Sequence, residues 1–383
     1  MMKKAVTKQS YTTLITVPID PAFPTIGGIE AYSRNLLKYL SNSGINSILL
    51  GVSFTNITTT IDKVRFIPIS RNRRISGYEY LFRLLIKTPF ISIPESTIIY
   101  AQSPEFMLPF MFFHNKNPKL VHLHGNVLRD NRAERLRIIS FLYGLVESFV
   151  LKHANLVIAA DNITKEYYQQ EYPWIYKKIR VIPMAIDLSI FKLLERDCLR
   201  RQYGFKESDK VVMYLGRIAK EKNLGFLLRS FQFVLKSLPE SELVFVGDGK
   251  DINNLQQLTQ DLQLTRVQFM GAQEPNKVPE ILNCADVLVL CSISEGSPNV
   301  VKEALACGVP VVSTSVGDLP TIIVNDKIGK IVDADQEKFA QAIIEILLNN
   351  QRESTRVECA SVAANFNFDK TGAKITEIFR ELC

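Results

Sequence analysis

Two glutamates, Glu295 and Glu303, frame the segment of this sequence with the clearest chemical content. Gly296 permits a tight turn after the first glutamate, and Pro298 suits the position just before a helix. We therefore expect a helix to begin near Asn299, where free backbone N–H groups can bind a phosphate. Glu303 lies one turn inside that helix and can accept hydrogen bonds from a ribose diol. A lone glutamate would more often complement the helix dipole, but two glutamates around one turn favour a binding site.

A second group of polar residues places two cations, Arg217 and Lys222, after a glycine, Gly216. The group follows a predicted strand at 211–215, so it lies at the carboxyl end of that strand. A guanidinium and an ammonium there suit a diphosphate, and they can neutralise a nucleotide leaving group without a metal ion. The alternative is a pair of surface cations bonded to Glu221.

Two weaker signals lie in the first half of the chain. Gly27 and Gly28 follow the first predicted strand and let the backbone approach a ligand closely at the start of the next helix. His124 ends another predicted strand beside Gly125, where an imidazole can hydrogen-bond a substrate hydroxyl. The alternatives are an ordinary glycine turn and a histidine satisfied by packing.

The elements that must position these residues alternate along the chain. Short apolar runs are separated by segments of helical period, a pattern typical of parallel sheets covered by helices. Strands are predicted at 13–19, 47–53, 64–69, 97–101, 120–124, 156–160, 179–183, 211–215, 242–246, 267–270, 287–290, 310–314 and 329–332. Helices are predicted at 29–43, 78–87, 132–152, 164–171, 224–238, 252–262, 277–284, 300–307 and 338–349. This order predicts two doubly wound α/β units with a ligand cleft at the carboxyl ends of the strands.

Charge is distributed unevenly along the chain, whose formal net charge is +7. Residues 1–190 carry 23 Lys and Arg against 13 Asp and Glu, whereas the remainder is slightly acidic. Basic clusters at 71–74 and 129–137 lie beside apolar and aromatic stretches at 78–90 and 138–151, which suits contact with an anionic membrane surface. A solvated charged face is the open alternative. Nucleic acid is not expected as a partner, because the sequence has no nucleic-acid-binding motif.

Length and composition exclude several classes of protein. With 383 residues, of which 46% are hydrophobic and 22% charged, the chain is typical of a two-domain globular protein. It has no apolar run of the roughly 20 residues that span a bilayer and no signal-peptide pattern, so a cytoplasmic location is expected. The six cysteines predict neither a disulfide framework nor a zinc site. Asp333 and Asp335 resemble a metal-binding pair, but Asp335 is interpreted as a helix N-cap, and no metal is expected.

Together these motifs resemble glycosyltransferase family 4, whose members are retaining glycosyltransferases of the GT-B fold. The family pattern is a glutamate, seven residues, and a second glutamate followed by Ala-x-Ala-x-Gly-x-Pro-Val-Val, which here runs from Glu295 through Glu303 to Val312. The Gly-Arg-x-x-x-Glu-Lys segment from Gly216 to Lys222 and the early Gly-Gly loop match in order, and the resemblance covers nearly the whole chain. The tail at 365–371 resembles the aromatic start of the family's last helix.

The resemblance implies a fold of the α/β class. Two Rossmann-like, doubly wound domains would face each other across a cleft, and the C-terminal helix would cross back to the first domain. Residues 1–187, with 366–383, would form the acceptor-binding domain. Residues 188–365 would form the nucleotide-sugar-binding domain.

The resemblance also implies roles for the residues described above. Glu303 would hold the donor ribose, and Arg217 and Lys222 would hold the diphosphate. Glu295 would lie near the hydroxyls of the transferred sugar, and His124 would contact the sugar near the reacting carbon. Further donor contacts would come from Gly27, Gly28, Gly216, Gly296, Ser297, Pro298, Asn299 and Val300.

The expected reaction moves a sugar from a nucleoside-diphosphate sugar, with UDP as the first guess, to an acceptor hydroxyl. It would retain anomeric configuration and need neither metal nor other cofactor. The acceptor is expected to be a lipid-linked or membrane-associated glycan in polysaccharide or glycolipid biosynthesis, which would place the enzyme at the inner face of the cytoplasmic membrane. Three alternatives stay open: an epimerase or hydrolase of nucleotide sugars, a non-catalytic nucleotide-sugar-binding subunit, and a nicotinamide-dependent dehydrogenase. The missing Gly-x-Gly-x-x-Gly fingerprint opposes the last of these.

Overall fold

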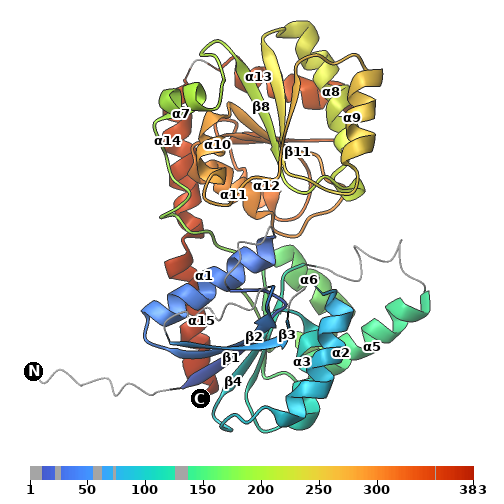
Figure 1. The fold of residues 1–383 in the computed structure, drawn as a ribbon, viewed down its shortest axis with the longest axis vertical. Helices are drawn as coiled ribbons and strands as arrows, with labels where there is room; N and C mark the ends of the chain where they lie inside the picture. The colour runs from blue at the N-terminus through green and yellow to red at the C-terminus, as the bar shows by residue number, and fades with distance from the viewer. Residues whose placement is uncertain (1–10, 22–26, 55–62, 72–74, 126–136, 350) are drawn as a thin grey trace, which may run out of the picture. The chain divides into compact units, whose positions relative to one another are not determined.

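The computed structural model describes residues 11–21, 27–54, 63–71, 75–125, 137–349 and 351–383. Its packing divides the chain into two compact units (Figure 1). The first unit comprises Met1–Met184 and Phe368–Cys383, and the second comprises Ala185–Asn367. Most of the basic clusters at 71–74 and 129–137 lies outside the described residues, as does the start of the predicted helix 132–152.

The described residues of the first unit form a seven-stranded parallel sheet. Its strands are β1 (Thr12–Thr16), β2 (Asn46–Val52), β3 (Val64–Ser70), β4 (Ile98–Ala101), β5 (Lys119–Leu123), β6 (Leu156–Ala159) and β7 (Ile179–Val181). They lie in the order β3-β2-β1-β4-β5-β6-β7. The chain winds one way from β1 to β3 and the other way from β4 to β7, so the switch point lies between β1 and β4.

Helices surround this sheet. They are α1 (Gly28–Asn42), α2 (Gly77–Lys87), α3 (Pro104–Phe113), α5 (Arg137–His153), α6 (Asn162–Glu171) and α15 (Phe368–Leu382), with the short 3-10 helices η1 (Thr88–Phe90) and η2 (Pro173–Ile175). Helix α3 was not predicted, because Pro109 interrupts its apolar sequence. The structure accommodates Pro109 inside the helix, where burial of Phe106, Met107 and Phe110 in the core offsets the lost backbone hydrogen bond.

The described residues of the second unit form a six-stranded parallel sheet. Its strands are β8 (Lys210–Leu215), β9 (Ser241–Val246), β10 (Val267–Gly271), β11 (Val287–Leu290), β12 (Val311–Thr314) and β13 (Gly329–Val332). They lie in the order β10-β9-β8-β11-β12-β13. The switch point therefore lies between β8 and β11, the two strands that precede the strongest sequence motifs.

The helices of the second unit fit the predicted doubly wound pattern. They are α7 (Arg196–Gln202), α8 (Leu224–Ser237), α9 (Ile252–Asp261), α10 (Val278–Cys284), α11 (Asn299–Ala306), α12 (Leu319–Ile322), α13 (Gln336–Leu347) and α14 (Arg352–Ala363), with the 3-10 helices η3 (Lys220–Lys222) and η4 (Ala364–Phe366). The interpretation of Asp335 as an N-cap is confirmed, because its Oδ1 accepts a hydrogen bond from the Lys338 N–H at 2.9 Å.

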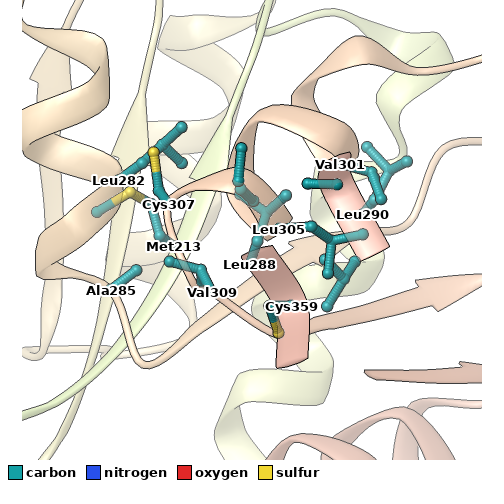
Figure 2. Close-up of a cluster of buried hydrophobic side chains, with 14 of the residues drawn as sticks. Met213, Leu282, Ala285, Leu288, Leu290, Val301, Leu305, Cys307, Val309 and Cys359 are labelled. Atoms are coloured by element: carbon teal, nitrogen blue, oxygen red, sulfur yellow. The ribbon is translucent and has the colours of Figure 1, made fainter. Parts of the chain in front are cut away.

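A core of buried side chains lies between this sheet and its helices. Figure 2 shows Met213 and Leu288 from the strands beside Leu282, Leu305 and Cys359 from α10, α11 and α14. This packing fixes α11, and with it the Gly296–Asn299 turn, at the carboxyl end of β11.

The last helix returns to the first unit, as the resemblance implied. Phe368, at the start of α15, is buried and its ring lies 5.5 Å from the ring of Tyr32 on α1. Gly372 lets the two helices approach closely, because a Cβ there would lie 2.5 Å from the Tyr39 ring. The aromatic residues at the end of the chain thus anchor α15 against α1.

Candidate functional site

The two strongest motifs lie at the switch point of the second sheet. The loop after β8 and the loop after β11 leave neighbouring strands at their carboxyl ends, and a backbone hydrogen bond of 2.9 Å from the Ile293 N–H to the Glu221 carbonyl oxygen joins them. Open α/β sheets bind their ligands at this position. The tertiary structure therefore brings together residues that lie far apart in sequence.

Lys222 and Glu295, both predicted as catalytic residues, form an ion pair. The Lys222 ammonium donates to Glu295 Oε1 at 2.6 Å, and the side chains are 17% and 16% exposed. The Ser292 hydroxyl donates to the same oxygen at 2.7 Å. These two hydrogen bonds fix the Glu295 carboxylate and keep the Lys222 ammonium beside it.

Arg217 lies in the same loop but points to a different partner. Its Nη2 donates to Glu221 Oε1 at 2.9 Å, and the two side chains are 69% and 49% exposed. In the structure Arg217 fits the alternative interpretation of a surface cation, whereas Lys222 does not. An exposed pair of this kind is worth about 0–1 kcal/mol, so the guanidinium can leave Glu221 at little cost.

Glycines shape the turn that carries Arg217. Gly216 has φ +155°, and the Tyr214 hydroxyl donates to the Arg217 carbonyl oxygen at 2.8 Å. Gly247 has φ +136°, and a Cβ on it would lie 2.0 Å from the Gly216 carbonyl oxygen. The lack of a side chain on Gly247 therefore lets the 247–249 segment pack directly against the Gly216 turn.

The Gly296 turn is packed against a second loop of the same unit. The Asp318 N–H donates to the Gly296 carbonyl oxygen at 3.1 Å, and a Cβ on Gly317 would lie 1.8 Å from that oxygen. The Ser297 hydroxyl donates to Asp318 Oδ2 at 2.6 Å. Helix α11 begins at Asn299 with Pro298 as its N-cap residue, as predicted, so the N–H groups of Asn299 and Val300 belong to its first turn.

Lys302 is a charged side chain of this site that sequence reasoning missed. It is 0% exposed, and its ammonium donates to Ser297 Oγ at 2.5 Å. Asp318 Oδ2 lies 3.9 Å from the ammonium, and the Phe366 ring centroid lies 5.0 Å away. Its only sequence signal is a lysine inside an otherwise apolar helix start, between Val301 and Glu303.

Glu303, the predicted ribose ligand, is partly buried in α11. Burial raises the pKa of its carboxyl to about 7, and the neighbouring Lys302 ammonium opposes that shift. The carboxyl is thus poised to accept hydrogen bonds from a diol, because an anion in a partly apolar site gains more from such donors than one in water.

The remaining predicted residues belong to the first unit. His124 follows β5, with Nε2 2.9 Å from Gln102 Oε1 and Nδ1 3.1 Å from the sulfur of Met184. Burial lowers the pKa of His124 to about 3, so its imidazole is neutral at neutral pH. The His122 ring stacks on the His124 ring with centroids 4.0 Å apart. This packing fits the alternative interpretation of His124 as a histidine satisfied by its neighbours at the end of the strand.

Gly27 and Gly28 stand at the start of α1, on the loop that follows β1. Both are exposed, and the Gly27 carbonyl oxygen accepts the Ala31 N–H at 3.0 Å. They follow β1, one of the two strands at the switch point of the first sheet, whereas His124 follows β5 and contacts Gln102 after β4. Within the described part of the chain, no three side chains of His, Cys, Asp or Glu gather as a metal site would require.

Two family models between them match most of the chain. Residues 26–190 match the model described as Glycosyltransferase Family 4, and residues 195–364 match Glycosyl transferases group 1. The chain belongs to glycosyltransferase family 4. It is a glycosyltransferase of the GT-B type, as the motifs around Glu295 and Gly216 indicated.

The relatives of this glycosyltransferase match different shares of its chain. It is 23% identical to N-acetyl-alpha-D-glucosaminyl L-malate synthase of Bacillus anthracis, over 94% of the chain and 95% of that relative. It is 26% identical to UDP-Gal:alpha-D-GlcNAc-diphosphoundecaprenol alpha-1,3-galactosyltransferase of Escherichia coli, over 69% and 70%. Sucrose-phosphate synthase from Thermosynechococcus elongatus has the same fold, with a TM-score of 0.84 at 21% identity over 97% and 99% of the two chains.

Within its described residues, the glycosyltransferase has no helix that combines the length and the hydropathy of a bilayer span.

Proposed function

We propose that this glycosyltransferase moves a sugar from a nucleoside-diphosphate sugar to an acceptor hydroxyl, with retention of anomeric configuration and without a metal ion. The observation that carries the proposal is the Lys222–Glu295 pair, held at 2.6 Å in the loops that precede and adjoin the N-terminus of α11. An ammonium and a helix N-terminus at one switch point suit the negative charge of a diphosphate.

In this proposal different residues bind different parts of the donor. Lys222 and the N–H groups of Asn299 and Val300 bind the diphosphate, and the Glu303 carboxyl accepts the ribose hydroxyls. Glu295 accepts hydroxyls of the sugar. Because Arg217 is paired only with an exposed carboxylate, it turns from Glu221 to the diphosphate when the donor binds.

The chemical step follows from this division. The bond between the anomeric carbon and the phosphate oxygen breaks, and the acceptor oxygen bonds to the same face of that carbon. The acceptor proton passes to the departing phosphate oxygen. Lys222, Arg217 and the first turn of α11 stabilise the charge that develops on the diphosphate. A contact of His124 with the sugar requires that one of its ring nitrogens exchanges Gln102 or Met184 for a sugar hydroxyl.

The proposed donor carries UDP, and the proposed acceptor is a lipid-linked or membrane-associated glycan at the inner face of the cytoplasmic membrane. The basic first half of the chain supports the acceptor, with 23 Lys and Arg against 13 Asp and Glu in residues 1–190. The name of the E. coli relative supports both, since it contains UDP-Gal and a diphosphoundecaprenol acceptor.

Thermal stabilisation tests the donor site. The chain is heated with UDP, GDP, ADP, CMP or NAD, each at the same excess. A ligand of the native state present at a hundred times its Kd adds about 2.7 kcal/mol to stability. We expect one nucleoside diphosphate to stand out and Glu303→Lys to remove its effect. Glu337→Lys, an exposed position on α13, is the matched control and should keep the effect. Stabilisation by none of them, or by NAD alone, would contradict the proposal.

A further inference from the structure

Large apolar side chains gather on one group of helices in the first unit. Of the 20 that are exposed in the described residues, half belong to α2, η1, α3 and α5. These are Tyr78, Phe82, Ile86, Phe90, Phe112, Phe113, Phe141, Leu142, Leu145 and Phe149, which we call the apolar face. Scattered exposed apolar residues are normal, but a contiguous patch of this size marks an interaction site.

Helix α5 shows most clearly that the face is directed outward. Phe141, Leu142 and Leu145 are 66%, 55% and 53% exposed. The opposite side of the helix carries Glu147 and Val150, both 0% exposed. In a helix that only covers a core, the outward side would be polar. Here the outward side is apolar, and the helix buries its carboxylate.

Buried hydrogen bonds fix that orientation of α5. The Tyr168 hydroxyl donates to Glu147 Oε1 at 2.7 Å, and the Tyr172 hydroxyl donates to Oε2 at 3.1 Å. Tyr168 lies in α6, and Tyr172 is the residue that follows this helix. Rotating α5 to hide Leu142 and Leu145 would break both hydrogen bonds, so the exposure is built into the fold.

The three longer helices that carry the apolar face are neighbours in the fold. Helix α3 packs against both α2 and α5 (Figure 1). The rings of Phe112 on α3 and Phe149 on α5 are stacked, with centroids 5.9 Å apart. On α2, Tyr78, Phe82 and Ile86 recur every four residues, which places them in one stripe.

The stretch of sequence that carries the apolar face is basic. Residues 71–153 carry 12 Lys and Arg against six Asp and Glu. Burial lowers the Lys87 pKa, and repulsion from Arg71 and from Arg83 lowers it further. The carboxylate of Glu147, in contrast, is buried. Cations around exposed aromatic and aliphatic side chains complement anionic headgroups above an acyl boundary.

We propose that the apolar face inserts into the headgroup–acyl boundary of an anionic membrane, with α5 as the deepest element. The occupant is a lipid bilayer, because its chemistry matches both the apolar side chains and the basic residues around them. The inference deepens the proposed function, since its purpose rests on a lipid-linked acceptor. The insertion itself needs neither donor nor acceptor.

Vesicle co-sedimentation of the full chain tests this proposal. Vesicles of phosphatidylcholine alone are compared with vesicles that also contain phosphatidylglycerol. The test variant is Leu142→Gln/Leu145→Gln, which changes two exposed side chains. The matched control is Leu348→Gln/Val357→Gln in the second unit, where the side chains are similarly exposed at 55% and 61%. We expect the wild type and the control to bind the anionic vesicles, and the test variant to bind at least tenfold more weakly.

Two outcomes would overturn the proposal. One is equal binding of test variant and control, or no binding of the wild type. The other is a dimer in gel filtration that the test variant abolishes, which would assign the face to a second copy of the chain. Nucleotide stabilisation, measured without vesicles, is expected to be the same in all three proteins. Its loss from all three would count against the proposed function and leave the membrane result standing.

Discussion

Replacing Lys302 by methionine should weaken the second unit through one buried polar cluster. The methionine side chain has a similar length but carries no charge. It removes the charge-assisted hydrogen bond to Ser297 at 2.5 Å and the ammonium that faces Asp318 at 3.9 Å and the Phe366 ring at 5.0 Å. Because Lys302 is 0% exposed, water cannot replace it in these contacts.

The size of the effect follows from these contacts. A hydrogen bond to a charged group is worth about 1.5–3 kcal/mol, and a cation–π contact is worth about 0.5–2 kcal/mol. Methionine avoids the desolvation cost of the ammonium, which offsets part of the loss, but it leaves the Asp318 carboxylate without that cation. We expect a net loss of about 3 kcal/mol. For a domain of this size, the melting temperature falls by about 2–4 °C for each kcal/mol.

Urea unfolding of the second unit measures the loss, with Lys206→Met as the control because that lysine is exposed. The double variant Lys302→Met/Asp318→Asn should recover at least half of it, because asparagine removes the carboxylate charge that faced the ammonium and still accepts from Ser297. A loss below about 1 kcal/mol in the single variant, or no recovery in the double variant, would refute the assignment of Lys302 as a buried cation that holds the Ser297 turn.

Two further predictions concern other parts of the chain. Arg217→Ala should lower kcat by a factor of about 10²–10³, because the diphosphate loses a stabilising cation. The free energy of unfolding should change by less than about 1 kcal/mol, because the ion pair with Glu221 is exposed. Unchanged turnover would contradict the proposed role of Arg217. Burial raises the pKa of Glu147 to about 7, so the unfolded chain loses this proton first and stability falls as the pH rises from about 4.5 to 7. The variant Glu147→Gln has no carboxylate to bury, so near pH 8 its free energy of unfolding in urea should exceed that of the wild type by about 2 kcal/mol. Near pH 5 this difference should vanish. An equal difference at both pH values would contradict the raised pKa of Glu147.

Most of the sheet could be predicted from the sequence. The run 287–290 is uniformly Val and Leu and is the full extent of β11, because a strand of a parallel sheet is buried on both faces and leaves no polar alternation. The N-cap at Asp335 and the start of α11 after Pro298 were also predictable, since they depend on local backbone chemistry. Helix α3 was missed because only the surrounding core makes a helix with an internal proline stable.

The candidate site divides in the same way. The sequence by itself determined which residue types follow β8 and β11, and therefore that cations, glutamates and a helix N-terminus occur near a switch point. Only the tertiary structure decided that Lys222 pairs with Glu295 while Arg217 pairs with an exposed neighbour. Which cation pairs with which carboxylate depends on contacts between loops of distant sequence, and a one-dimensional pattern does not contain those contacts.

Helix α5 and Lys302 both show that a sequence pattern does not determine which side chains are buried. The periodicity of a helix indicates that it has an apolar side but not whether that side meets a core or the solvent. Neighbouring helices decide this, and they leave Leu142 and Leu145 outward. Lys302 is buried in turn, and Ser297, Asp318 and Phe366 contact its ammonium. Composition and local chemistry thus determined the elements and the ligands they can hold, whereas burial and pairing, which depend on the whole fold, were decided by the tertiary structure.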